Sequence, residues 1–290
     1  MSTCAQHMDP EAGREIGAGW AEFYGGLPKG AKILDIGTGN GLLPLIALQV
    51  SDGAKKEFEV HGADLADIDP EKALPEHAPH LARVTFHPGC PTERLPFPAG
   101  TFDAITGQHA FEYGDPEKSA GEVASVLKSG GKFRFLMHAA GSEIIKANFC
   151  KIEQSRYILE DVKLFEMTRE AVKIGDGEAL KGALGITSSK FASDPNTTDL
   201  IQLLDLLWGA FEQRDKFESD AVFQHWIKEN RAELGAQKVR IEALFEAALD
   251  KPGIKALENI FKALSFNLKT TPVNAKVGGQ VGWLMEGDKL

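Results

Sequence analysis

The chain has 290 residues, of which 43% are hydrophobic and 26% are charged, and its formal net charge is −10. Such a chain can bury one large core or two, and its acidic charge disfavours nucleic acid as a partner because it repels phosphate backbones. Three widely spaced cysteines match neither a zinc site nor a disulfide framework, so we predict no metal. The N-terminus lacks a signal peptide, and no apolar run approaches the ~20 residues of a membrane span. We therefore expect a cytoplasmic protein with no membrane contact.

The first predicted elements are a helix, a strand and a second helix. Residues 10–24 have helical patterning that includes Trp20 and Tyr24, whose rings either pack in the core or form a flap over a ligand. The short apolar run 33–36 predicts a buried strand, and glycines follow it at positions 37, 39 and 41. Because glycine has no Cβ and accepts positive φ, this turn lets backbone approach a ligand closely before a helix begins at residue 42.

Four more strands follow at intervals that leave room for helices. Residues 57–64 predict a second strand that ends in Asp64, and residues 84–86 predict a third. Residues 102–106 predict a fourth strand, directly before Gln108 and His109; residues 132–137 predict a fifth, after a turn at 129–131 and before His138. Strands alternating with helices indicate a parallel α/β sheet, and ligands bind at the carboxyl edge of such sheets.

The pattern changes after residue 140. Residues 142–265 show no clear strand, and their apolar residues recur at helical spacing, as at Ile201, Leu204, Trp208 and Phe211. Residues 279–285 predict a final strand. We therefore expect a core formed by residues 1–140 and 266–290, with residues 141–265 as a helical insertion or cap that shapes the acceptor pocket.

The glycine turn discriminates between two cofactor classes. A dinucleotide fingerprint has its third glycine three positions after the second, but Leu42 occupies that position and the glycine is Gly41. The turn therefore disfavours a dehydrogenase. Asp64 lies about 23 positions beyond the turn, where a carboxylate reaches a ribose diol. Asp67 and Asp69 are nearby alternatives that also fit a solvated loop or a helix cap.

The motifs together resemble the class I S-adenosylmethionine-dependent methyltransferases. They are LDIGTGNG at 34–41, Asp64, ERLPFPAGTFDAITGQ at 93–108 and VLKSGGKFRF at 126–135. The resemblance covers residues 20–140 and the last strand. It implies a Rossmann-like, mostly parallel sheet with an antiparallel last strand, and S-adenosyl-L-methionine as the cofactor, with S-adenosyl-L-homocysteine as its product.

The resemblance also implies roles for particular residues. The glycines would pack against the methionine part of the cofactor, Asp35 would hold its amino group, and Asp64 would bind the ribose hydroxyls. The family's adenine-binding aspartate falls on Pro91 here, so Thr92, Glu93 or a neighbour would hold the adenine. The implied cofactor-binding residues are Asp35, Gly37, Thr38, Gly39, Asn40, Gly41, Asp64, Leu65, Thr92, Glu93 and Gln108.

The catalytic residues are harder to predict, because a sulfonium methyl is already electrophilic and the enzyme mainly aligns a nucleophile with it. A general base is needed only for an acceptor that is protonated at neutral pH. His109 and His138 are the candidate catalytic residues; the alternative is a structural or substrate-shaping role. Candidate residues of the substrate pocket are Trp20, Tyr24, Glu112 and Tyr113.

We expect transfer of a methyl group to O or N of a small-molecule acceptor. The chain lacks the Asn-Pro-Pro-Tyr, Asp-Pro-Pro-Tyr and Pro-Cys motifs of nucleic-acid methylation, and it lacks an acidic cluster for catechol-type magnesium. The alternative is a non-catalytic S-adenosylmethionine-binding regulatory or interaction protein that uses the helical block for docking. That block is also the candidate surface for a homodimer.

Overall fold

The computed structural model describes residues 10–194, 197–275 and 279–290. The chain divides into two compact units, and each has a core of its own. We call Met1–Glu143 with Ala247–Leu290 the sheet domain, and Ile144–Glu246 the helical domain.

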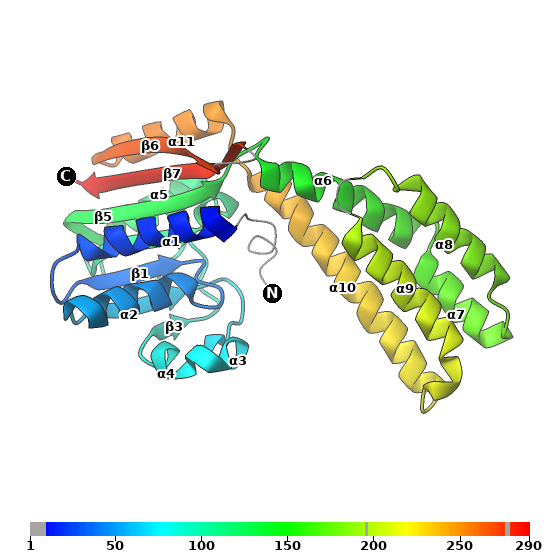
Figure 1. Cartoon of the computed structure of the whole chain (residues 1–290). Coiled ribbons are helices and arrows are strands. Elements are labelled where there is room, and N and C mark those ends of the chain that lie inside the picture. The colour runs from blue at the N-terminus through cyan, green and yellow to red at the C-terminus, as the bar shows by residue number, and fades with distance from the viewer. Residues whose placement is uncertain (1–9, 195–196, 276–278) are drawn as a thin grey trace. The chain divides into compact units, whose positions relative to one another are not determined.

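The sheet domain contains a 7-stranded sheet in the order β3-β2-β1-β4-β5-β7-β6 (Figure 1). Strands β1 to β5 run parallel, whereas β7 pairs antiparallel with both β5 and β6. This confirms the expected α/β fold class, a mostly parallel sheet with an antiparallel last strand. The strands are β1 (Lys32–Ile36), β2 (Glu59–Ala63), β3 (Thr85–His87), β4 (Phe102–Gln108), β5 (Leu127–His138), β6 (Phe266–Ala275) and β7 (Gly279–Lys289).

Two details of the sheet differ from the sequence prediction. Strand β6, which the sequence analysis missed, contains Pro272 and lies at the sheet edge, where a residue without a backbone N–H is tolerated. The predicted turn at 129–131 lies inside β5 as an irregularity. The pairing shifts there from Phe102–Leu127 to Ala104–Lys132, and Gly130 adopts a φ of 73°.

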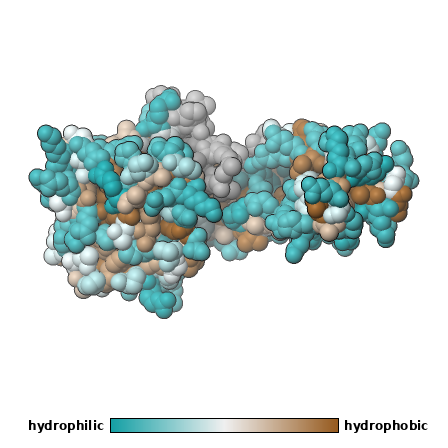
Figure 2. All heavy atoms as spheres, turned by 90° about the horizontal axis from the view of Figure 1, so that it is seen from below, coloured by the Kyte–Doolittle hydropathy of each residue, from teal (hydrophilic) through white to brown (hydrophobic). Residues whose placement is uncertain are grey.

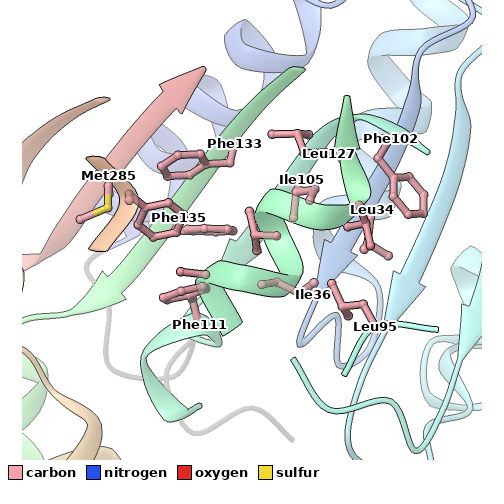
Figure 3. Close-up of a cluster of buried hydrophobic side chains, with 14 of the residues drawn as sticks. Leu34, Ile36, Leu95, Phe102, Ile105, Phe111, Leu127, Phe133, Phe135 and Met285 are labelled. Carbon is pink, nitrogen blue, oxygen red and sulfur yellow. The ribbon is translucent and has the colours of Figure 1, made fainter. Parts of the chain in front are cut away.

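Helices cover both faces of the sheet and bury a separate cluster on each. Helices α1 (Pro10–Gly25) and α2 (Leu42–Ala54) pack on one face, with side chains of β1, β2 and β4. Helices α5 (Pro116–Val126) and α11 (Lys251–Ala263) pack on the other. Figure 3 shows Phe133 and Phe135 of β5 in this second cluster, together with Phe111 and Met285. The two clusters hold the strand ends of the candidate site in fixed positions.

Short helices fill the connections of the sheet domain. Helix α3 (Pro70–Ala73), the 3-10 helix η2 (Pro75–His77) and α4 (Ala78–Leu81) lie between β2 and β3, and η3 (Phe111–Tyr113) follows β4. Asp69 caps α3 by accepting a hydrogen bond from the Lys72 N–H. A helix cap was one of the two alternatives that the sequence left for Asp69.

The helical domain has its own apolar core, built from its helices and the turns between them. Of the residues at helical spacing in α9, Leu204 and Phe211 are buried, whereas Ile201 is 47% exposed. The elements of this part of the chain are α6 (Glu143–Arg156), the π-helical η4 (Tyr157–Asp161), α7 (Leu164–Ile174), α8 (Glu178–Lys190), α9 (Thr198–Glu212), η5 (Arg214–Lys216) and α10 (Asp220–Ala247).

The predicted helical block, residues 141–265, extends beyond the helical domain, which is Ile144–Glu246. Helix α11 lies within that predicted block, but it contacts β6 and α5 and belongs to the sheet domain. That the remaining helices cap an acceptor pocket stays a prediction. Among the described residues, no helix has the length and hydropathy that crossing a bilayer requires. The face in Figure 2 is mainly hydrophilic, with small apolar patches.

The chain leaves the sheet domain after β5 and returns just before α11. At this point Ala139 and Leu249 form an isolated parallel bridge. The Leu249 N–H donates to the His138 carbonyl, and the Ala140 N–H donates to the Leu249 carbonyl, each at 2.9 Å. Trp283 of β7 also donates its Nε1–H to that carbonyl at 2.9 Å. The departing and returning segments are therefore joined to each other and to the sheet.

Candidate active site at the carboxyl end of the sheet

The glycine turn follows β1 at the carboxyl edge, and all three of its glycines have positive φ: 59° at Gly37, 50° at Gly39 and 82° at Gly41. A Cβ on Gly37 would lie 2.3 Å from the Cβ of Ala110, and one on Gly41 would lie 2.8 Å from a methyl group of Leu81. A Cβ on Gly39 would have no described atom within 4 Å. The outer glycines are therefore required by packing, whereas Gly39 exposes backbone to open space.

Asp64 lies directly after β2 and is bonded to this turn. Its Oδ2 accepts a hydrogen bond from the Gly39 N–H at 2.8 Å, and its Oδ1 accepts one from the Ala66 N–H at 2.9 Å. The next side chain, Leu65, is 71% exposed. Within the turn, Asn40 is exposed, whereas Thr38 is buried and its Oγ1 has no hydrogen-bond partner among the described residues. An exposed leucine beside a fixed carboxylate provides an apolar surface for a flat ring.

Asp35 lies in β1 and is only 2% exposed. Thr106 of β4 donates a hydrogen bond from Oγ1 to Asp35 Oδ1 at 2.9 Å, and Tyr24 donates from its hydroxyl to Thr106 Oγ1 at 3.1 Å. Burial, with a smaller contribution from the negative charge of Asp64, raises the pKa of Asp35 to about 7 against the lowering effect of its hydrogen bonds to threonine. Burial also raises the pKa of Tyr24 well above its usual value, so Tyr24 remains a donor. A cation beside Asp35 would favour its ionised form.

Trp20 and Tyr24 are buried in the α1 face of the core, with 1% and 0% exposure, and their rings stack at 6.3 Å. Trp20 Nε1–H donates to Gln108 Oε1 at 2.7 Å, so α1 is fixed to the end of β4. The structure thus describes the packing role that the sequence left open for both rings. That they also contact a substrate, and that Gln108 contacts the cofactor, stay predictions.

Thr92 and Glu93 interact with the start of α5. Thr92 Oγ1 lies 3.1 Å from Ser119 Oγ, and Glu93 Oε1 accepts a hydrogen bond from the Asp115 N–H at 3.0 Å. This backbone hydrogen bond lowers the pKa of Glu93. Both side chains therefore hold the loop after β3 against α5, and an adenine contact by either one stays a prediction.

The two candidate catalytic histidines lie together. The rings of His109 and His138 are 3.9 Å apart between centroids and tilted by 25°. Glu112 of η3 approaches His138 Nδ1 to 2.7 Å with Oε1, and the same oxygen accepts a hydrogen bond from the His138 backbone N–H at 2.8 Å. Tyr113 is 45% exposed and its ring meets that of His138 edge-on. The structure therefore brings four predicted residues to the ends of β4 and β5.

His109 is the strained member of this group, because its φ of 56° is positive in a residue other than glycine. Burial lowers the pKa of His109 well below its usual value, and the neighbouring His138 lowers it further. The imidazole is therefore neutral at neutral pH. The sequence predicted both histidines at this edge but gave no sign that Glu112 bonds one of them. The only signal for Glu112 was its place three residues after His109.

Part of the sheet domain is similar in sequence to methyltransferases. Residues 33–131, from β1 into β5, match the family model described as a methyltransferase domain. An uncharacterized methyltransferase, YcgJ of Bacillus subtilis, is 31% identical over 125 residues, which are 41% of this chain and 45% of that protein. Demethylmenaquinone methyltransferase of Thermus thermophilus is 37% identical over 102 residues, which are 35% of this chain and 44% of the relative.

Two solved structures are similar to this chain over most of its length. The Burkholderia thailandensis 1,6-didemethyltoxoflavin-N1-methyltransferase, with bound 1,6-didemethyltoxoflavin and S-adenosylhomocysteine, has a TM-score of 0.46 at 14% identity; the alignment covers 97% of this chain and 79% of that one. The YcgJ structure from Bacillus subtilis has a TM-score of 0.39 at 16% identity, covering 95% of this chain and 98% of that one. The chain spans less than half the length of both curated relatives above. What the comparisons support is thus a methyltransferase domain over residues 33–131.

Proposed function

We propose that the sheet domain binds S-adenosyl-L-methionine and transfers its methyl group to O or N of a small-molecule acceptor. The observation that carries this proposal is the open backbone of Gly39 between two fixed carboxylates, Asp35 and Asp64. The match of residues 33–131 to a methyltransferase domain supports the choice of cofactor.

The side chains at this edge fit the chemical groups of that cofactor. Asp35 is buried with a raised pKa, and pairing with a cationic amino group would stabilise its ionised form. Asp64 is held by the Gly39 N–H at Oδ2 and by the Ala66 N–H at Oδ1, and each oxygen has a lone pair left for a hydroxyl donor.

When bound, the cofactor supplies an electrophilic methyl group. The chain's contribution is to position the acceptor and exclude water, because the sulfonium needs no further activation. Ala110 packs against Gly37, so the adjoining His109 lies beside the turn. We propose that an acceptor occupies this side of the turn, facing His109 and Tyr113. His109 is the candidate general base there: its lowered pKa keeps the imidazole unprotonated but also makes it a weaker base than a free histidine.

Calorimetry with S-adenosylhomocysteine tests the cofactor site. We expect Asp64→Asn to weaken binding about 10-fold to 100-fold, because hydrogen bonds to a charged group contribute about 1.5–3 kcal/mol. Asp67→Asn is the matched control, because Asp67 is an exposed acid three residues away. Equal affinities for Asp64→Asn and the wild type would contradict the assignment.

A second experiment tests catalysis. The chain is incubated with S-adenosylmethionine and a panel of phenols, amines and heterocycles, and release of S-adenosylhomocysteine is measured. Acceptor-dependent release supports a methyltransferase. Tight cofactor binding without release on any panel member would favour the alternative, a non-catalytic cofactor-binding protein.

A further inference from the structure

His109, Glu112 and His138 have the composition of a metal site, although the cysteine pattern predicted none. Each offers one ligand atom, and these atoms lie within 4.8 Å of one another. Glu112 has a side-chain exposure of 0%, as does His138, and His109 has 8%. Two imidazoles and one carboxylate form a common ligand set for divalent zinc, iron and their first-row neighbours.

A second observation is independent of the ligand count. Within the described part of the chain, His109 Nδ1 and Glu112 Oε2 are buried atoms without hydrogen-bond partners. Nearly all buried polar atoms are paired, and each exception calls for an ion, a water molecule or a function. Both atoms belong to one cluster, so a single bound species can satisfy them together.

The distances show how an ion would enter. His109 Nδ1 lies 4.0 Å from Glu112 Oε1, somewhat more than the ~3.3 Å between two tetrahedral ligand atoms that each lie ~2.0 Å from one ion, so a small side-chain movement would bring them into range. His138 Nδ1 lies 2.7 Å from the same oxygen, a distance at which these two atoms share a proton. A metal ion would replace that proton, which passes to solvent, and Glu112 would turn its second oxygen toward His109.

The scaffold favours binding because the ligands come from fixed elements. His138 ends β5, and His109 follows β4 with its backbone N–H bonded to the carbonyl of Leu136 in β5. Glu112 is held by the His138 backbone N–H. We propose that His109, Glu112 and His138 bind one divalent first-row transition-metal ion. This proposal stands whether or not the domain transfers a methyl group.

Metal titration of the full-length, untagged chain tests the proposal. After treatment with EDTA, Zn²⁺ binding is measured by calorimetry and Co²⁺ binding by visible absorption. We expect one ion per chain and a Co²⁺ spectrum of nitrogen and oxygen ligands. We expect His109→Asn and Glu112→Gln each to weaken Zn²⁺ binding at least ~100-fold, since loss of even an indirect contact costs 10-fold to 100-fold. Asparagine at position 109 tolerates the positive φ.

The control variant is His225→Ala, which removes an exposed histidine on α10 and should bind Zn²⁺ like the wild type. Circular dichroism and S-adenosylhomocysteine calorimetry check that each variant is folded, and the latter tests the proposed cofactor site separately. A wild-type chain that binds no stoichiometric Zn²⁺ or Co²⁺ would overturn the proposal. So would folded variants at 109 and 112 that bind as tightly as the wild type.

Discussion

Asp35→Asn should change how the stability of the ligand-free sheet domain depends on pH. The folded pKa of Asp35 is about 7, against an ordinary value of 3.8, because the carboxyl is buried. Below 3.8 both the folded and the unfolded states are protonated and the shift has no effect. Above it the unfolded state loses its proton first, so stability falls as pH rises toward 7.

The magnitude follows from the size of the shift. At 1.36 kcal/mol per pKa unit, a rise from 3.8 to about 7 corresponds to a total loss of about 4 kcal/mol. Between about pH 5 and pH 8 the wild type should lose about 2–3 kcal/mol relative to Asp35→Asn. Asparagine can still accept the hydrogen bond from Thr106 but cannot ionise.

Hydrogen exchange read by mass spectrometry on peptides of β1 and β4 reports the stability of this domain alone. The measured quantity is the difference in opening free energy between wild type and Asp35→Asn at each pH, so that the titration of all other groups cancels. A difference that stays constant within about 0.5 kcal/mol over this pH range would show that the pKa of Asp35 is not raised in the folded state. A cation bound at Asp35 should remove the loss, so cofactor binding should strengthen as pH rises toward 7.

Three further substitutions test the packing of the site. Gly37→Ala should destabilise the fold by about 2–4 kcal/mol in urea unfolding, because its Cβ would clash with Ala110 at positive φ. Gly39→Ala should lower the free energy of unfolding by only about 1–2 kcal/mol, since its Cβ meets no described atom, but it should weaken S-adenosylhomocysteine binding. A Gly39→Ala variant less stable than Gly37→Ala would contradict the packing described. Trp20→Phe should destabilise by about 1–2 kcal/mol by leaving Gln108 Oε1 without its donor, and an unchanged melting temperature would count against that hydrogen bond.

The parallel part of the sheet could be predicted because its signals are local. Short apolar runs followed by glycine or a carboxylate predict β1 and β2. Both strands are mostly buried, and a short buried run of this kind is typical of a strand in a parallel sheet. Strand β6 was missed because Pro272 and its polar neighbours give weak alternation, and its pairing with β7 alone makes it a strand. The end of the helical domain was equally hidden, since α11 has the same helical period as α10.

The candidate site also has one part that the sequence predicts and one part that it does not. The positive φ of Gly37, Gly39 and Gly41 follows from the requirement for glycine in a tight turn, so a pattern of residue types predicts it. The bond between Glu112 and His138 depends on the register of β5 beside β4, across 26 positions of the chain. Tertiary pairing of this kind leaves no periodic trace in a single sequence.

The bridge between Ala139 and Leu249 makes the helical domain a replaceable module. The segments that enter and leave it are paired like neighbouring parallel strands, about 5 Å apart, so a crossover of about a dozen residues or more must join them, and residues 144–246 supply it. The entropy of closing an inserted segment grows only slowly with its length, and here both of its ends are already fixed to the sheet. A crossover of another length or fold could therefore replace residues 144–246 while the glycine turn and its two carboxylates stay unchanged.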